Sequence, residues 1–359
     1  MDSRENTREL IGKGKPERVG YYDTFWSELG EKWRSQGRIP KDTDPSVVFG
    51  NDIAGVGGWF DSLPIRGSKE TIEETDQWRI IRNGAGALLK WWKNKSGTPE
   101  HIGFAMKDRE VWERDYRWRL AGVDDERLNL EAARNAMEKW GDSGKFTVFG
   151  DLFIWELLRG SAGDLCMYES IALDPDWIHD FNRVYTDFYM RHFARLIELI
   201  GAPDGVILYD DLGYRNGLFC SPAKLWELYF PYYKKIVDFF HARDIYVLLH
   251  SCGAIEQALP MIVEAGFDAL NPMEVKAGCS AVRFAEKYGY KLAFVGGFDA
   301  RILESGDRDL IKRETAAFMK DMKSVGARFF FGSDHSCSSR VDYDCYVCAL
   351  DTYRENMMY

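Results

Sequence analysis

Two stretches of the sequence decide the fold: GVILYDD at residues 205–211 and IYVLLHSCG at residues 245–253. Each is a short apolar run that ends in polar residues, and an amphipathic helical pattern follows each of them. A strand that is apolar at consecutive positions is typical of a parallel sheet whose two faces are both covered by helices. We therefore predict an α/β fold built on buried parallel strands.

The same alternation extends along most of the chain and predicts a (β/α)₈ barrel. Seven strands can be placed, and we expect an eighth nearer the N-terminus. The predicted strands are Ser46–Asp52, Lys145–Phe149, Gly205–Tyr209, Ile245–Leu249, Asp268–Leu270, Leu292–Val295 and Arg328–Phe331. The predicted helices between and after them cover 175–200, 222–242, 254–265, 280–288 and 307–325.

Two regions fall outside this regular alternation. Residues 1–45 are predicted to be a polar and helical N-terminal extension, which leaves 46–359 as a single barrel domain. A β-ribbon is predicted near 77–92, because Asn83-Gly84 separates two β-rich runs and this dipeptide favours a hairpin turn. Residues 108–142 are highly charged and are predicted to be helices outside the barrel.

The composition narrows the functional classes. The chain has 359 residues and a net charge of −10, which argues against a nucleic-acid binder. It has seven cysteines, an odd number without regular spacing, and this favours free thiols in a reducing cytoplasm. The sequence has neither a long uncharged apolar run nor the apolar core of a secretory signal. We therefore expect a soluble cytoplasmic protein with no membrane association.

Polar and ionisable residues gather directly after the predicted strands. In a parallel barrel the carboxyl ends of all strands meet at one rim, where active sites form. Five consecutive strands deliver such residues to that rim, so we predict the active site there. They are Tyr209, Asp210, Asp211, His250, Cys252, Asn271, Glu274, Asp299, Asp334, His335 and Cys337.

The His250 and Cys252 pair predicts half of a zinc site, because imidazole and thiolate together suit Zn²⁺. A catalytic zinc needs a third protein ligand, and the second HSC tripeptide offers Cys337 or His335. Glu274 is a possible fourth, displaceable ligand. The alternative for any of these cysteines is core packing as a small apolar side chain. We expect core packing for the Cys345-x-x-Cys348 pair, which has no matching second pair.

Adjacent acids at Asp210 and Asp211 have two interpretations. They could cap the following helix, but that helix is predicted to begin near Ser221, ten residues further on. We therefore predict that these acids, with Tyr209, hold substrate or serve as catalytic proton donors.

From about residue 145 to the C-terminus, these segments resemble the uroporphyrinogen decarboxylase superfamily. The matching segments are YDDLG at 209–213, SPAKLWELYFPYYKKI at 221–236, HSCG at 250–253, VGGFDARIL at 295–303 and GSDHS at 332–336. The resemblance implies a (β/α)₈ barrel. It also implies one of two chemistries, metal-free decarboxylation or corrinoid-dependent methyl transfer.

Decarboxylases of the first branch bind an acidic tetrapyrrole through an N-terminal segment of the form R-Q-A-G-R-Y. The corresponding stretch here is expected to be SVVFGNDIAGVGGWF at 46–60, which has no arginine. The cobalamin-dependent methyltransferase branch carries an H-x-C pair and a later cysteine that bind zinc. His250 and Cys252 match the pair, whereas His335 stands where that cysteine is expected and Cys337 lies two residues beyond it.

The resemblance to the methyltransferase branch implies a zinc enzyme that demethylates a methoxylated, aromatic substrate and passes the methyl group to a partner corrinoid protein carrying cob(I)alamin. Homodimerisation is also expected from the resemblance. Candidate substrate-binding residues are Trp59, Phe60, Phe298, Asp299 and Asn271. Two alternatives stay open: a metal-independent decarboxylase that uses Asp210 and His335, and a non-catalytic barrel that binds a corrinoid or tetrapyrrole.

Overall fold

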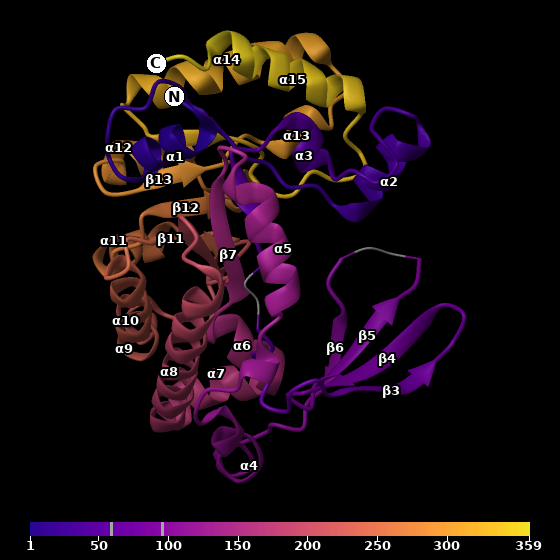
Figure 1. Cartoon of the computed structure of the whole chain (residues 1–359), viewed down its shortest axis with the longest axis vertical. Coiled ribbons are helices and arrows are strands. Elements are labelled where there is room, and N and C mark those ends of the chain that lie inside the picture. The colour runs from indigo at the N-terminus through magenta and orange to yellow at the C-terminus, as the bar shows by residue number, and fades with distance from the viewer. Residues whose placement is uncertain (58–59, 95–96) are drawn as a thin grey trace.

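The chain folds around one eight-stranded parallel sheet that curves into a nearly closed barrel (Figure 1). The computed structural model describes residues 1–57, 60–94 and 97–359. The strand order is β1-β14-β13-β12-β11-β8-β7-β2, and every pair in it is parallel. The strands are β1 (Gly20–Tyr21), β2 (Ile53–Gly55), β7 (Phe146–Leu152), β8 (Gly205–Tyr209), β11 (Tyr246–Ser251), β12 (Ala269–Pro272), β13 (Ala293–Val295) and β14 (Phe329–Phe331). The predicted (β/α)₈ barrel is confirmed.

The first and last strands of this order, β1 and β2, meet at a seam. A backbone hydrogen bond crosses the seam, from the amide of Asp52 to the carbonyl of Tyr21 at 2.8 Å. The Asp52 carboxylate also accepts from the backbone amide of Tyr21 and pairs with Arg18. The side chain of Asp52 therefore helps to hold β1 against β2 at a seam where the backbone hydrogen bonds are few.

Side chains alternate between the barrel interior and the surrounding helices, as a strand period of two requires. On β7, Phe146 and Val148 belong to the interior cluster, whereas Phe149 packs with the helices. Leu10 and Ile11 of the N-terminal helix α1 (Ser3–Ile11) join the same interior cluster and close one end of the barrel. The N-terminal segment is therefore part of the barrel's core.

Two predictions near the N-terminus need correction. Ser46–Asp52 is not a strand: Asp44 caps a short helix over Pro45–Phe49, with proline at its first position where its missing N–H costs nothing. The neighbouring strand is β2, and the missing eighth strand is β1. The barrel therefore begins ahead of residue 46, where the sequence analysis placed its start.

Helices surround the barrel on its outer face, as Figure 1 shows for α8 beside β7 and for α14 and α15 on the far side. The predicted helix over 175–200 is confirmed as α8. The other helices are α2 (Ser27–Ser35), α3 (Pro45–Phe49), α4 (Arg109–Val111), α5 (Leu130–Gly141), α6 (Ile154–Ala162), α7 (Asp164–Leu173), α9 (Pro222–Leu228), α10 (Phe230–His241), α11 (Leu259–Ala265), α12 (Ala281–Tyr288), α13 (Ala300–Leu303), α14 (Arg308–Ser324) and α15 (Tyr343–Asn356). Within the described ranges, no helix combines the length and the apolarity that a membrane crossing needs.

An antiparallel sheet is inserted after β2 and projects away from the barrel (Figure 1). The predicted hairpin is confirmed within it, because Trp78–Asn83 pairs antiparallel with Leu88–Trp92. The Asn83 side chain accepts from two amides of the turn, those of Ala85 and Ala87. The sheet has four strands rather than the two predicted. They are β3 (Lys69–Glu74), β4 (Trp78–Asn83), β5 (Leu88–Trp92) and β6 (Glu100–Gly103).

Candidate functional site

Three potential metal ligands converge at the carboxyl ends of β8 and β11. Leu248 lies in the barrel interior, so His250 and Cys252, two and four residues further on, continue on the inward side. On β8, Ile207 is interior and Asp211 follows it at the same parity. Two adjacent strands thus bring an imidazole, a thiol and a carboxylate together.

The distances within this cluster suit a single metal ion. The ligand atoms of Asp211, His250 and Cys252 all lie within 4.8 Å of one another. The Cys252 Sγ is 3.4 Å from the His250 Nε2, which in turn is 4.0 Å from the Asp211 Oδ1. Tetrahedral Zn²⁺ with ordinary Zn–S and Zn–N bonds would hold such a sulfur and nitrogen about 3.5 Å apart. The donor set therefore fits zinc.

A hydrogen-bond chain fixes the tautomer of His250. The Asn271 Nδ2 donates to the Val295 carbonyl at 2.9 Å, which turns the Asn271 Oδ1 toward His250. That oxygen lies 2.6 Å from the His250 Nδ1 and can only accept, so Nδ1 carries the hydrogen. The lone pair of the neutral ring is then on Nε2, which faces Cys252. Metal-binding histidines are commonly held in this way.

The local electrostatics favour a cation beside Cys252. Burial, reinforced by the negative charges of Asp211 and Glu274, raises the pKa of the Cys252 thiol. Burial also lowers the pKa of His250, which favours its neutral ring. A divalent cation would supply the missing positive charge and would favour the thiolate.

The cluster forms part of the wall of a cavity of about 250 Å³ at the barrel mouth. Aromatic rings of Tyr22 and Trp26 line the cavity, and the Trp26 ring stacks on His335. Thr98, which lies between β5 and β6 of the inserted sheet, is part of the same wall. The lining residues are Tyr22, Asp23, Thr24, Trp26, Thr98, Asp211, His250, Cys252, Asn271, Pro272, Ser333, His335 and Ser336.

The second HSC tripeptide contributes to the cavity differently from the prediction. His335 lines it with His250, so it lies close to the cluster without belonging to it. Cys337 does not face the cluster: its amide donates to the Thr24 carbonyl, and its buried Sγ lies 3.6 Å from Asp23. The third potential ligand beside His250 and Cys252 is therefore Asp211, rather than Cys337 or His335 as predicted.

Glu274 lies beside the His250–Gly253 turn rather than in the cluster. Its carboxylate accepts from the Gly253 amide at 2.9 Å and pairs with Lys276 at 3.1 Å. Gly253 has a φ of 82° and approaches the Gly213 backbone so closely that a Cβ would clash. Glu274 therefore supports the turn that carries Cys252.

The two adjacent acids have separate environments. Asp210 has outward parity and is fully buried. Its carboxylate accepts from the first-turn amides of α6 at Trp155 and Glu156, and from the Tyr233 hydroxyl at 2.6 Å. Capping, which the sequence analysis set aside, is thus its observed contact, with the helix after β7 rather than the one after β8. Tyr209 packs near His250, with ring centroids 5.0 Å apart.

The other predicted substrate-binding residues, apart from Asn271, lie away from the cavity. Phe60 packs in the core against the Tyr189 and Phe193 rings of α8. Phe298 packs against Phe331 and Phe318. Asp299 caps α13 and pairs with the side chain of Arg301. Trp59 lies outside the described residues.

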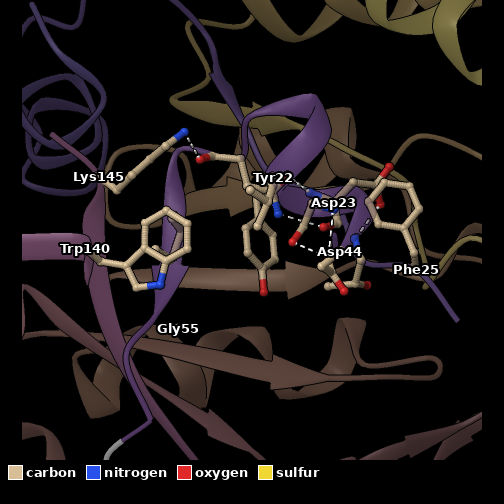
Figure 2. A pocket seen from close by; sticks show the side chains of 13 residues that line it. Tyr22, Asp23, Phe25, Asp44, Gly55, Trp140 and Lys145 are labelled. Atoms are coloured by element: carbon tan, nitrogen blue, oxygen red, sulfur yellow. Dashed lines mark hydrogen bonds between the residues drawn. The ribbon is translucent and has the colours of Figure 1, made fainter. Parts of the chain in front are cut away.

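The residues that follow β1 were missed by the sequence analysis. Tyr22, Asp23 and Thr24 line both the cavity that contains the Asp211–His250–Cys252 cluster and a second one of about 360 Å³ beside the β1–β2 seam. In Figure 2 the Tyr22 ring stands between Trp140 on one side and Asp23 on the other. A two-residue strand has too short an apolar run to be recognised, although the polar Asp-Thr pair after it was visible.

Comparison with known proteins supports the family resemblance. The model of the uroporphyrinogen decarboxylase (URO-D) family matches residues 160–355, which is more than half of the chain. The chain belongs to this family. Its matched region carries Asp211, His250, Cys252 and His335, so most of the cavity's polar wall comes from the part shared with the family.

One solved structure extends the likeness to the whole fold. A methyltransferase from Methanosarcina mazei matches with a TM-score of 0.70 at 15% identity, over 99% of each chain. A D-psicose 3-epimerase from Clostridium cellulolyticum H10 gives a TM-score of 0.38 at 12% identity, over 71% of this chain and 97% of the epimerase. No curated protein matches the chain.

The rim position of β1 bears on which branch of the URO-D family the chain resembles. In the structure the segment that follows the barrel's first strand is Tyr22-Asp23-Thr24-Phe25-Trp26 rather than 46–60, and it lies at the rim formed by the carboxyl ends of the strands. It has no arginine and contains an acid in place of cationic side chains. The arginine-rich segment expected of a porphyrinogen decarboxylase is missing here as well.

Proposed function

We propose that this URO-D family member is a zinc-dependent methyltransferase that demethylates a methoxylated aromatic substrate and passes the methyl group to the cobalt of a partner corrinoid protein. The observation that carries the proposal is the Asp211–His250–Cys252 cluster, with the His250 tautomer set by Asn271. The fold shared with the Methanosarcina mazei methyltransferase is compatible with it.

Asp211, His250 and Cys252 would hold the zinc ion through a carboxylate oxygen, the Nε2 and the thiolate. When bound, the ion supplies Lewis acidity, which makes an ether oxygen a better leaving group. A zinc ion held by three protein ligands would keep one position for substrate, as catalytic zinc sites do. The Asn271 side chain keeps the imidazole oriented throughout, because it is itself tied to the Val295 carbonyl.

The cavity supports an aromatic ether as the substrate class. Its volume of about 250 Å³ suits a single substituted ring, and Tyr22 and Trp26 offer faces on which that ring can stack. A corrin macrocycle is too large for this space, so the corrinoid would stay with its partner protein outside the mouth. In the proposed reaction the methyl C–O bond breaks, a Co–C bond forms and the phenolate leaves.

Metal analysis and a cobalamin assay together test the proposal. The purified protein should contain about one zinc per chain, and Cys252→Ala should lose it. With a methoxybenzoate and chemically reduced free cobalamin as the probe, absorbance should change from the cob(I)alamin to the methylcob(III)alamin spectrum. Demethylated phenol should form in equal amount.

A matched control is Cys345→Ala, because Cys345 is a buried cysteine on α15 outside the site. This variant should keep its zinc and its methyl transfer. Protein that is free of metal, correctly folded and fully active would overturn the proposal. Release of carbon dioxide from an acidic substrate without cobalamin would favour the decarboxylase alternative. The role assigned there to Asp210 is less favoured, since Asp210 is buried under α6.

A further inference from the structure

Asp23 is a buried carboxylic acid in the wall of the cavity that contains the Asp211–His250–Cys252 cluster. It lies two residues beyond the end of β1, and only 4% of its surface is exposed. Its hydrogen-bond partners are neutral: the Ser333 hydroxyl, the Tyr346 hydroxyl, the Thr24 amide and the Cys337 thiol. A buried carboxylate without a cation is costly, so the environment favours a proton on this group.

The hydrogen bonds of Ser333 point to the same conclusion. Its Oγ lies 2.5 Å from the Asp23 Oδ1 and 2.5 Å from the His335 carbonyl oxygen. A hydroxyl has one hydrogen to donate, and a carbonyl oxygen can only accept. Both contacts are satisfied together when Ser333 donates to His335 and a protonated Asp23 donates to Ser333. The geometry therefore has a place for a proton on the Asp23 Oδ1.

The remaining groups around Asp23 fix its position. The Tyr21 and Tyr346 hydroxyls lie 2.7 Å apart, and Tyr346 donates to the Asp23 Oδ2 at 2.8 Å. The titratable groups that face Asp23 are Tyr21 and Tyr22 at the end of β1, Tyr346 of α15, and Cys337 after β14. Burial raises the pKa of Asp23 to about 6, so both protonation states are accessible near neutral pH. A general acid must regain its proton from solvent after each turnover, so both of its protonation states must be accessible at the working pH.

We propose that Asp23 is the acid that protonates the departing phenolate, directly or through the Ser333 hydroxyl. The inference rests on the proposed demethylation, because it needs a leaving oxygen. Asp23 and Ser333 both line the cavity that contains the Asp211–His250–Cys252 cluster, so the leaving oxygen and the acid share one space.

The proton balance closes without any further reactant. The methyl carbon leaves the ether oxygen with no electrons of the C–O bond, and the oxygen keeps that pair. The Asp23 proton passes to the oxygen directly, or Ser333 turns its hydroxyl from the His335 carbonyl to the oxygen, gives its own proton and receives that of Asp23. The products are the phenol, the methylated corrinoid and the Asp23 carboxylate. Solvent then returns a proton to Asp23 when the phenol has left.

The first experiment measures the proton itself and needs no methyl transfer. Infrared spectra of the wild-type protein should show a carboxylic-acid C=O band that fades as the pH rises from about 5 to about 8. The band should be missing from Asp23→Asn, and Ser333→Ala should shift its frequency by removing a hydrogen-bond partner. If no such band titrates in this range, the inference is overturned, whatever becomes of the proposed function.

The second experiment separates acid catalysis from support of the structure. Asp23→Asn should slow demethylation by about 100-fold for an ether whose phenol is weakly acidic. The loss should be less than about 10-fold for a nitrophenyl methyl ether, whose phenolate leaves without a proton. Tyr346→Phe is the matched control, because it removes a hydrogen bond to Asp23 but keeps the acid. It should affect both substrates equally.

An equal loss for both substrates in Asp23→Asn would show that Asp23 only supports the fold. If Asp23→Asn does not fold, the same comparison in Asp23→Glu and Ser333→Ala replaces it. Because glutamate keeps a carboxylic acid, the demethylation rate of Asp23→Glu should depend on the acidity of the phenol as weakly as the wild-type rate does. If no variant or wild-type protein transfers methyl groups while the infrared band titrates as expected, then the proposed function fails and the protonated state of Asp23 stands.

Discussion

The His250 Nδ1 lies 2.6 Å from the Asn271 Oδ1, and Asn271 is anchored by its own donation to the Val295 carbonyl. β11, β12 and β13 are neighbours in the sheet, so this chain of contacts crosses three adjacent strands. The orientation of the imidazole is therefore set by the barrel itself rather than by a flexible loop.

This relationship predicts that Asn271 controls metal affinity. Asn271→Ala should weaken zinc binding by about 10- to 100-fold, because the His250 ring loses its fixed tautomer and orientation. Titration against a chromophoric chelator measures the affinity. Asn271→Asp, which keeps an acceptor facing Nδ1, should bind zinc more tightly than the alanine variant. Equal affinities in wild type and Asn271→Ala would contradict this role.

The composition of the proposed metal site can be tested by comparing Asp211 with Cys337. Asp211→Ala should lower the zinc content of the purified protein, because it removes one of three ligands within reach of a common ion. Cys337→Ser should keep its zinc, since the Cys337 Sγ faces Asp23. Elemental analysis of both variants decides the matter. Zinc lost from Cys337→Ser and kept in Asp211→Ala would restore the ligand set expected from the sequence.

Asp210 is expected to matter for stability rather than for metal binding. Asp210→Ala leaves the amides of Trp155 and Glu156 and the Tyr233 hydroxyl without their buried acceptor. The free energy of unfolding should fall by about 2–4 kcal/mol, as for other buried groups that lose their partners. Urea unfolding measures it, with Asp299→Ala, at a more exposed helix cap, as the control. A variant as stable as wild type would show that α6 does not depend on this contact.

One ion pair on the opposite side of the barrel gives a pH dependence with a defined sign. The His241 Nε2 lies 2.8 Å from an Asp268 carboxylate oxygen, and this hydrogen bond raises the pKa of His241 above its ordinary value of 6.5. A raised pKa in the folded state adds stability below the unfolded pKa, and this contribution is lost as the pH rises through the folded value. His241→Gln should therefore cost more stability at about pH 5.5 than at about pH 8.5. Urea unfolding at both pH values tests this, and equal costs would refute it.

The sequence pattern predicted the site best at His250 and Cys252. Their place after a buried strand predicted a shared rim, and the strand period of two put both on the inward side. The same parity separates Asp210 from Asp211. The sequence pattern did not show which strand lies beside β8 in the sheet. That strand is β7, and α6 begins directly after it, so Asp210 contacts the start of α6.

The choice between Cys337 and His335 illustrates a different limit. Both follow β14, where the chain leaves the strand in an irregular segment and no longer alternates regularly. The Thr24 carbonyl accepts the Cys337 amide and turns its thiol away from the cluster, while His335 reaches the cavity beside Trp26. The partner that decides this direction lies more than 300 residues away in the sequence, so no local pattern contains it.

By itself the sequence determined the parallel α/β barrel, the positions of its longer strands and the rim that carries polar residues. Those features follow from local patterns of apolar residues. A strand buried on both faces has consecutive apolar residues, and a helix buried on one face has apolar residues spaced at the helical period. The tertiary structure alone decided that β1 completes the barrel, that Asp211 joins His250 and Cys252, and that Asp23 lies buried against Ser333. Each of these depends on contacts between segments far apart in the chain, where side-chain direction is set by the packing of neighbouring strands.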